Sequence, residues 1–413
     1  MSRFFSRRLA RLSPYVPGEQ PQGREYIKLN TNESPFPPSP RVLEALGGGE
    51  AARLNLYPDP EARAAASAIA ERHGLSPAHV MLTNGSDEAL AFCFQAFCDG
   101  SAPAVFPDVT YGLYAVLARL YGVPSRIVPL LPDFSVDFAG IAGITGIAGI
   151  ADIADIADIA ETADTDGTDD IAGTAGTADT DGIAGIAGSC GGRAAVFLAN
   201  PNAPTGIAAP AAAVERLISS NPGTVFIVDE AYVEFGAESV APLICRCGNL
   251  AVVHTMSKSR NLAGARIGYV LADPELIADL NTVRYSFNPY SVSRLALTAA
   301  EAAIRDGAYY DACVTAIAQT RSHVSRELLR RGFDVLPSLA NFVFARPGFI
   351  GGCEYYAALK ERGVLVRHFA APERISGFVR ITIGTEGQMQ ALLDATDAIA
   401  AGTGGRPTGR ANG

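Results

Sequence analysis

Short apolar runs that alternate with helix-forming segments are the feature that most restricts how this chain of 413 residues can fold. The runs have the length of buried strands, and segments with helical spacing, such as residues 87–98, lie between them. Strands separated by helices form a parallel sheet that is covered on both faces. The sequence therefore predicts an α/β fold with a mostly parallel sheet, built from residues 79–85, 102–107, 194–201, 224–233 and 250–257.

The C-terminal part of the chain has a different pattern. Beyond about residue 290, helical stretches precede strand-like segments at residues 340–347, 363–369 and 377–384. The chain is long enough for two domains, because single cores stop growing at about 250–300 residues. We therefore expect an N-terminal arm with the start of a small domain (1–45), a large domain (46–290), a smaller C-terminal α+β domain (291–402) and a flexible tail (403–413).

Residues 139–188 form an acidic, low-complexity stretch inside the predicted large domain. Isoleucine occurs at every third position from Ile141 to Ile159, a period that fits neither a strand nor a helix. The stretch holds ten acidic residues and no basic residue, and the rest of the chain is balanced in charge. We expect a disordered surface insertion, since lengthening a loop about fivefold costs only about 1.4 kcal/mol of closure entropy.

Composition and charge argue against several classes of protein. The balanced charge outside the insertion gives no sign of a surface that binds nucleic acid. No run approaches the roughly 18 apolar residues of a membrane span. The arginine-rich N-terminus faintly suggests a transit peptide or a membrane-surface helix, but it lacks the apolar core of a secretory signal, and we favour an arm that packs on the protein. The seven cysteines show no CxxC spacing, so we expect a reduced, cytoplasmic protein without a metal site.

Lys258 stands out because only three of the 33 basic residues are lysines. Arginine is the better binder of carboxylates and phosphates, but its guanidinium stays protonated and cannot act as a free amine. A lysine amine can lose its proton and form a Schiff base. The sequence therefore predicts amine chemistry at Lys258.

Other polar residues follow the ends of predicted strands, where open α/β sheets bind their ligands. Gly85 and Ser86 open a helix whose free N–H groups and positive dipole end suit a phosphate, although Ser86 could also serve as a helix cap. Asp229 ends an apolar strand, where a buried carboxylate needs a cationic partner. Together with Lys258 and Arg266, these residues fit one ligand, pyridoxal phosphate, which has an aldehyde, a ring nitrogen and a phosphate.

The order of the motifs resembles the fold type I pyridoxal-phosphate enzymes, which share the aspartate aminotransferase fold, and among them the histidinol-phosphate aminotransferases. The resemblance runs from about Leu12 to about Ile399 and is interrupted by the insertion. Several motifs in one order are more specific than any single pattern. In family order they are LSPYVPG, KLNTNESPF, LNLYPDP, TNGSDEAL, TYGLY, NPNAPTG, VDEAYVEF, TMSKSRNLAGARIG, NFVFAR and VRITIGT.

The resemblance implies a role for each matched residue. Lys258 would bond to the cofactor aldehyde and later move a proton between substrate and cofactor carbons. Asp229 would keep the ring nitrogen protonated, and Tyr232 would hydrogen-bond the ring hydroxyl. The other residues implied to bind the cofactor are Gly85, Ser86, Asp87, Thr255, Ser257 and Arg266 at the phosphate, Tyr111 on the ring face, Asn202, and Tyr57 from a second subunit. The residues implied to bind the substrate are Arg380, Asn341, Tyr290, Arg367 and Tyr15, the last also from the partner.

One position departs from the family pattern. The family often has asparagine immediately before Pro-Thr-Gly, where it contacts the ring hydroxyl. This chain has Ala203 there, and a methyl group cannot make that hydrogen bond. Asn202 is adjacent but would have to point differently, so the sequence leaves open whether it replaces the missing contact.

The resemblance implies a homodimeric aminotransferase with shared active sites that transfers an amino group between histidinol phosphate and 2-oxoglutarate in histidine biosynthesis. The alternatives with the same cofactor are an aromatic amino-acid aminotransferase and a threonine-phosphate decarboxylase. Tyr111, Tyr232 and Tyr290 could also be ordinary half-buried tyrosines, and Arg367 a surface arginine. An alternative of a different class is a non-catalytic protein in which residues 139–188 act as an interaction module.

Overall fold

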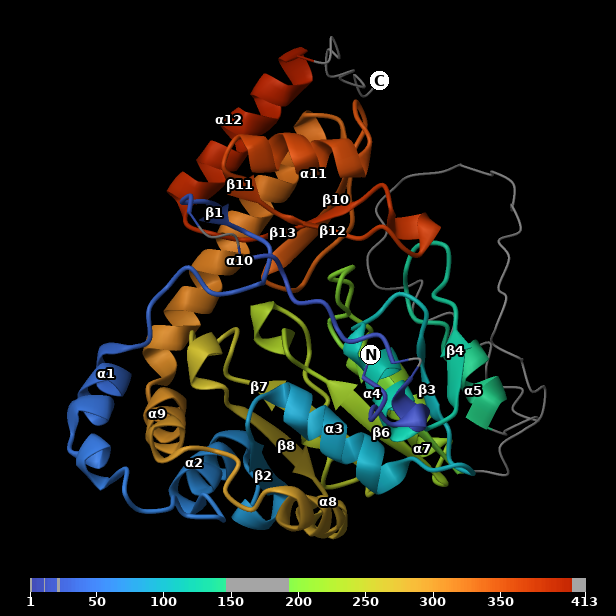
Figure 1. The fold of residues 1–413 in the computed structure, drawn as a ribbon, viewed down its shortest axis with the longest axis vertical. Helices are drawn as coiled ribbons and strands as arrows, with labels where there is room; N and C mark the ends of the chain where they lie inside the picture. The colour runs from blue at the N-terminus through green and yellow to red at the C-terminus, as the bar shows by residue number, and fades with distance from the viewer. Residues whose placement is uncertain (1, 11, 21–22, 146–192, 403–413) are drawn as a thin grey trace.

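A computed structural model describes residues 2–10, 12–20, 23–145 and 193–402. A seven-stranded sheet with its helices occupies the lower part of Figure 1, and a smaller sheet with its own helices lies above it. We call these the large-sheet part and the small-sheet part. The predictions for residues 146–192 and for the tail 403–413 lie outside the described residues.

The large sheet is mostly parallel, as the sequence predicts. Only β8 runs against the others, because it pairs antiparallel with both of its neighbours, β2 and β7. The other pairs are parallel. In spatial order the strands are β2 (Val80–Thr83), β8 (Gly268–Ala272), β7 (Leu250–Thr255), β6 (Thr224–Asp229), β5 (Ala194–Ala199), β3 (Ala104–Pro107) and β4 (Ser125–Val128).

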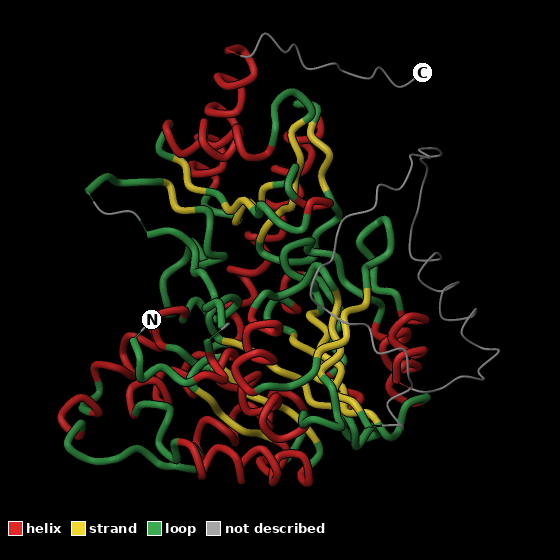
Figure 2. Tube along the Cα trace, turned by 45° about the vertical axis from the view of Figure 1, so that its right-hand side comes forward, coloured by secondary structure: helices red, strands yellow, loops and turns green. Residues whose placement is uncertain are grey.

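Helices cover both faces of this sheet (Figure 2) because side chains alternate between faces along each strand. In β6, Phe226 and Val228 enter one apolar core and Ile227 enters the other. The first core is covered by α1 (Pro40–Gly47), α2 (Arg63–His73), α5 (Phe138–Thr145), α7 (Ala211–Ser219) and α9 (Arg294–Arg305). The second is covered by α3 (Ser86–Phe97), α4 (Leu113–Tyr121) and α8 (Pro274–Phe287).

Helix α5 corrects the predicted start of the insertion, because residues 139–145 are helical and not part of a loop. Its buried residues are Phe138, Ile141, Ala142 and Thr145, which have the i, i+3, i+4, i+7 spacing of a helix face. The period-three isoleucine pattern hid this stripe, since Ala142 and Thr145 complete it. Thr145 also donates a hydrogen bond to Asn221 at 2.6 Å, which ties the end of α5 to the segment after α7.

The small-sheet part joins the two ends of the chain. Its antiparallel sheet has the order β12 (Arg367–His368), β13 (Val379–Thr382), β10 (Phe342–Pro347) and β9 (Phe333–Val335). Near the N-terminus, β1 (Ile27–Lys28) pairs in parallel with β11 (Val364–Leu365). Its helices are α10 (Gly307–Arg330), which connects the two parts in Figure 1, α11 (Gly352–Glu361) and α12 (Glu386–Gly402).

Short 3-10 helices occur in the connections. They are η1 (Arg7–Leu9), η2 (Glu50–Arg53), η3 (Pro77–His79), η4 (Val233–Phe235), η5 (Ala241–Leu243), η6 (Ala263–Ala265) and η7 (Glu373–Ile375). Within the described ranges, no helix has the length and apolar character needed to cross a membrane.

Candidate active site

A cavity of ≈ 550 Å³ lies where the ends of the large-sheet strands meet the N-terminal segment and the small sheet. This volume lies in the range of small-molecule sites. The predicted site residues that line the cavity are Tyr15, Ser86, Asp87, Tyr111, Asp229, Tyr232, Thr255, Ser257, Lys258, Arg266, Arg367 and Arg380.

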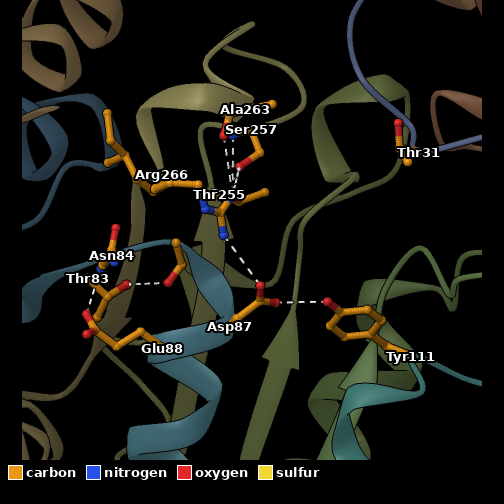
Figure 3. Close-up of polar contacts among 12 residues, drawn as sticks. Thr31, Thr83, Asn84, Asp87, Glu88, Tyr111, Thr255, Ser257, Ala263 and Arg266 are labelled. Atoms are coloured by element: carbon orange, nitrogen blue, oxygen red, sulfur yellow. Dashed lines mark hydrogen bonds and ion pairs between the residues drawn. The ribbon is translucent and has the colours of Figure 1, made fainter. Parts of the chain in front are cut away.

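One end of the cavity is built to hold an anion. Helix α3 begins after Gly85 without a side-chain cap, so the N–H groups of its first turn face outward with the positive end of the helix dipole. Thr255 donates a hydrogen bond to Ser257 at 2.9 Å, and Arg266 donates to the same Ser257 hydroxyl at 3.4 Å. Figure 3 shows Arg266, Thr255 and Ser257 close to the residues that open α3. This donor set fits a phosphate.

Two glycines allow this close approach. Gly85 has φ +83°, and a Cβ there would lie 2.4 Å from Nη2 of Arg266. A Cβ on Gly268 would lie 2.5 Å from the Gly85 carbonyl carbon and from the Ser86 nitrogen. A larger residue at either position would therefore push the start of α3, or Arg266, out of place.

Asp229 ends β6 in the depth of the cavity and is 5% exposed. Its carboxylate accepts hydrogen bonds from the Tyr114 hydroxyl at 3.1 Å and from the Ala231 amide at 3.2 Å, both of which are neutral donors. Burial raises the pKa of Asp229 to about 6. A protonated ring nitrogen would supply the positive charge that this buried carboxylate needs.

Lys258 follows β7 and points toward the N-terminal segment. Its amine donates a hydrogen bond to the Thr31 carbonyl at 3.1 Å. Burial, and after it the nearby Arg380, lowers the pKa of Lys258 to about 8, although the carboxylates of Glu33 and Asp87 oppose the shift. About a tenth of the amine is therefore free at pH 7.

This lowered pKa predicts the pH dependence of cofactor binding. Only the deprotonated amine attacks an aldehyde, so the rate at which the apoenzyme takes up pyridoxal phosphate should rise with pH and level off above about 8. Stopped-flow absorbance between pH 6 and 10 measures this rate. If the rate instead keeps rising between pH 8 and 10, as expected for the ordinary lysine pKa of 10.5, the cavity does not activate Lys258.

Asp87 and Asn32 orient the aromatic side chains of the cavity. The Asp87 carboxylate accepts a hydrogen bond from the Tyr111 hydroxyl at 2.8 Å and pairs with Arg266 at 3.4 Å, as the dashed lines of Figure 3 show. Asn32 donates a hydrogen bond to the Tyr232 hydroxyl at 2.9 Å. Both tyrosines are therefore held in place by polar side chains.

Arg367 and Arg380 bring positive charge to the other end of the cavity. They are register partners on the antiparallel strands β12 and β13. Arg380 donates a hydrogen bond to the Asn30 carbonyl at 3.1 Å, and its Nε is buried without a hydrogen-bond partner among the described residues. A partly buried guanidinium whose Nε is an unused donor is suited to binding an anionic substrate group.

Asn202 is a correction, because the structure does not bring it to the cavity. Its side-chain oxygen accepts a hydrogen bond from Thr110 at 2.9 Å, and its amide donates to the Val109 carbonyl at 2.9 Å and to Thr205 at 3.1 Å. Ala203 lines the cavity instead. Asn202 therefore stabilises the neighbouring loops and does not replace the asparagine missing before Pro-Thr-Gly.

Three other predicted residues lie elsewhere than expected or reach the site indirectly, and a fourth, Tyr57, is expected only in the site of a partner subunit. Tyr15 lines the cavity of its own chain and packs edge-on against Tyr111 at 5.8 Å, although we expected it to enter the partner's site. Tyr57 and Tyr290 stack at 4.5 Å on the surface, outside the cavity lining. Asn341 is fully buried and donates a hydrogen bond to the Asn32 carbonyl at 3.0 Å, so it supports the cavity without lining it.

Sequence reasoning missed Thr31, Asn32, Glu33 and Tyr114. Tyr114 lies close to Tyr111 in the motif TYGLY, where the helical spacing of the two tyrosines was an available signal. The residues from Thr31 to Glu33 lie in KLNTNESPF and reach the cavity through the pairing of β1 with the distant β11. Local sequence patterns do not show such a long-range pairing.

Comparison with known proteins places this geometry in context. Residues 24–148 and 170–395 match the family described as aminotransferase class I and II. The chain is 44% identical over 402 residues to histidinol-phosphate aminotransferase 2 of Dechloromonas aromatica, covering 97% of this chain and 99% of the relative. It is 45% identical over 394 residues to histidinol-phosphate aminotransferase 1 of Bradyrhizobium diazoefficiens, covering 95% and 98%.

Solved structures show the same fold. The histidinol-phosphate aminotransferase of Sinorhizobium meliloti in complex with pyridoxal-5'-phosphate matches with a TM-score of 0.76 and 25% identity, covering 97% of this chain and 99% of that one. Aspartate aminotransferase of Thermus thermophilus matches with a TM-score of 0.73 and 20% identity, covering 97% and 100%. The predicted fold type I architecture is therefore confirmed.

Proposed function

Because the chain belongs to the class I and II aminotransferases, we propose that it transfers an amino group between histidinol phosphate and 2-oxoglutarate, with pyridoxal phosphate as cofactor. One observation carries the proposal. A single cavity joins an activated amine at Lys258, a buried carboxylate at Asp229 and an anion seat at the start of α3. The full-length similarity to histidinol-phosphate aminotransferases supports the choice of substrate and a place in histidine biosynthesis.

Different residues of the cavity would bind different parts of the cofactor. When bound, pyridoxal phosphate draws electrons from the substrate Cα, which makes the proton on that carbon easier to remove. Asp229 would hold the proton on the ring nitrogen, Tyr232 would hydrogen-bond the ring hydroxyl, and Tyr111 would cover the ring face. Ser86, with the first turn of α3, Thr255, Ser257 and Arg266, would hold the phosphate.

Lys258 is the residue suited to moving the proton at the substrate Cα. A general base works best when its pKa lies near the working pH. The pKa of Lys258, about 8, populates both the free amine and the ammonium ion near neutral pH. The side chain can therefore accept the Cα proton and return it.

Arg380 and Arg367 would bind the anionic group of each substrate in turn. Histidinol phosphate carries a phosphate and 2-oxoglutarate carries carboxylates, and both anion types accept hydrogen bonds from the guanidinium fork. The unused Nε of Arg380 provides a donor for either one. One pair of arginines can thus serve both half-reactions.

We further infer a homodimer in which Tyr57 and Tyr290 reach the cavity of the partner subunit. Tyr57 is 78% exposed and lies beside other exposed apolar side chains, with Leu54 at 58% and Leu56 at 52%. Phe287 on the neighbouring surface is 68% exposed. Apolar groups that cluster in this way mark an interaction surface. The cytoplasm is the proposed compartment, because the six described cysteines are free thiols.

The proposal is tested by measuring kcat/KM for histidinol phosphate, phenylalanine, tyrosine and aspartate with 2-oxoglutarate. The kcat/KM of histidinol phosphate should exceed that of the other donors by at least about 10²-fold. The others lack its phosphate, and a buried site that binds a polar group rejects substrates that lack that group. Equal or higher values for an aromatic amino acid would contradict the assignment. Release of carbon dioxide from threonine phosphate, without formation of glutamate, would instead indicate the decarboxylase.

A further inference from the structure

Arg374 lies on the connection between the two strands that carry the substrate-site arginines. Arg367 on β12 and Arg380 on β13 are register partners, and residues 369–378 join them through η7. The position of this connection therefore determines the positions of the Arg367 and Arg380 guanidinium groups.

The Arg374 side chain crosses from the small-sheet part to the large-sheet part. It donates hydrogen bonds to the carbonyls of Leu130 at 3.0 Å and Leu131 at 2.8 Å. It also pairs with the Asp108 carboxylate at 3.4 Å and lies over the Phe134 ring at 4.5 Å. One guanidinium fork thus makes four contacts with the segments around β3 and β4, and we call this set the Arg374 clamp.

Asp108 extends the Arg374 clamp toward the cofactor side of the cavity. One of its oxygens accepts hydrogen bonds from the Val109 and Leu130 amides, both at 2.9 Å, and the other faces Arg374. Asp108 directly follows β3, and the same short segment leads to Tyr111 in the cavity. The clamp therefore connects the loop of the substrate arginines to the segment that presents the ring-covering tyrosine.

An apolar cluster makes this connection stiff. Phe378, the last residue of the connection 369–378, stacks on Phe344 at 4.8 Å and packs edge-on against Phe134 at 5.9 Å. Val109 and Ile375 belong to the same buried cluster. Close-packed interiors transmit displacement instead of absorbing it, so a shift of the clamp would reach Arg367 and Arg380.

We propose that Arg374 is a positioning residue that sets the distance between the substrate-binding arginines and the cofactor ring by fixing residues 369–378 to Asp108 and to the Leu130 and Leu131 carbonyls. The inference rests on the proposed anion-binding role of Arg380. It predicts that loss of the clamp weakens the binding of both substrates, because the anionic groups of both bind to the same arginines. The cofactor seat, which the large-sheet part supplies, should be unaffected.

The test compares R374Q with R346Q and R380Q. R374Q should raise KM for histidinol phosphate and for 2-oxoglutarate by about 10-fold with a smaller change in kcat, as expected for lost ground-state binding. Its dissociation constant for pyridoxal phosphate should match the unmodified enzyme. R346Q is the matched control, since Arg346 also lies over Phe378, at 5.1 Å, but pairs with Asp334 inside the small-sheet part. Its KM values should stay unchanged.

The three variants separate the possible failures. If R380Q raises KM and R374Q does not, the positioning role is wrong while the anion site stands. If R380Q leaves both KM values unchanged, the proposed anion site itself is wrong. Equal losses of substrate affinity, cofactor affinity and Tm in R374Q and R346Q would reduce the clamp to a general stability element and overturn the inference. Should R374Q fail to fold, R374K takes its place, because lysine keeps the charge but loses the fork.

Discussion

Replacing Lys258 with alanine is expected to lower kcat by at least about 10⁴-fold, because the variant loses both the amine that bonds to the cofactor and the base that moves the proton at Cα. The fold should survive the change. Burial already disfavours the charged form of Lys258, and Arg380 adds repulsion, so removing the amine relieves an unfavourable charge. Steady-state rates and thermal unfolding of K258A measure the two effects.

The scarcity of lysine offers a matched control for this variant. Lys360 is partly exposed and pairs with Glu19 at 2.6 Å on the surface of the small-sheet part. K360A should therefore keep kcat within about twofold, since surface substitutions of this kind have small effects. A K258A enzyme that retained more than about a tenth of the activity would show that another residue carries the chemistry.

Replacing Asp229 with asparagine should lower kcat by about 10²–10³-fold, because an amide cannot supply the negative charge that keeps the ring nitrogen protonated. The adjacent Glu230 gives the control. Burial raises the pKa of Glu230 to about 8, so this side chain is already neutral at pH 7. E230Q should thus leave kcat nearly unchanged at pH 7, although the two acids are neighbours in sequence. Comparable losses in D229N and E230Q would contradict the assigned role of Asp229.

The stability of the apoenzyme provides a second readout of Asp229. The pKa of about 6 in the fold lies above the ordinary value of 3.8. The stabilising contribution of the neutral acid is therefore complete below pH 3.8 and is lost as pH rises through about 6. Apo D229N lacks this loss, so its free energy of unfolding at pH 8 should equal or exceed that of the unmodified apoenzyme.

Local sequence patterns predicted the large sheet and the residues at its strand ends. The apolar runs before Asp229 and Lys258 are buried strands, and the motif order identified an aminotransferase, a class that the comparisons confirm. Strand β8 was missed because Gly268–Ala272 directly follows the small-residue stretch after Lys258, and only the short 3-10 helix η6, with no α-helix, separates it from β7. Its antiparallel pairing with β7 agrees with a connection that contains no crossover α-helix.

What the sequence did not show depends on contacts between distant segments. The position of Tyr15 follows from an N-terminal segment held by Arg367, which donates hydrogen bonds to the Val16 carbonyl at 3.1 Å and to the Pro17 carbonyl at 3.2 Å. The adjacency of Asn202 to the family's asparagine position was misleading, because its side chain was already committed to neighbouring loops. Local sequence patterns do not reveal such long-range hydrogen bonds.

The covalent attachment of the cofactor aldehyde to Lys258 is the central claim, and one measurement tests it directly. The enzyme loaded with pyridoxal phosphate is reduced with borohydride, digested and mapped by mass spectrometry. We predict a single pyridoxyl group, on the peptide that contains Lys258, and none on the peptides of Lys28 or Lys360. A label on either of those lysines alone, or no label on a cofactor-loaded enzyme, would contradict the account.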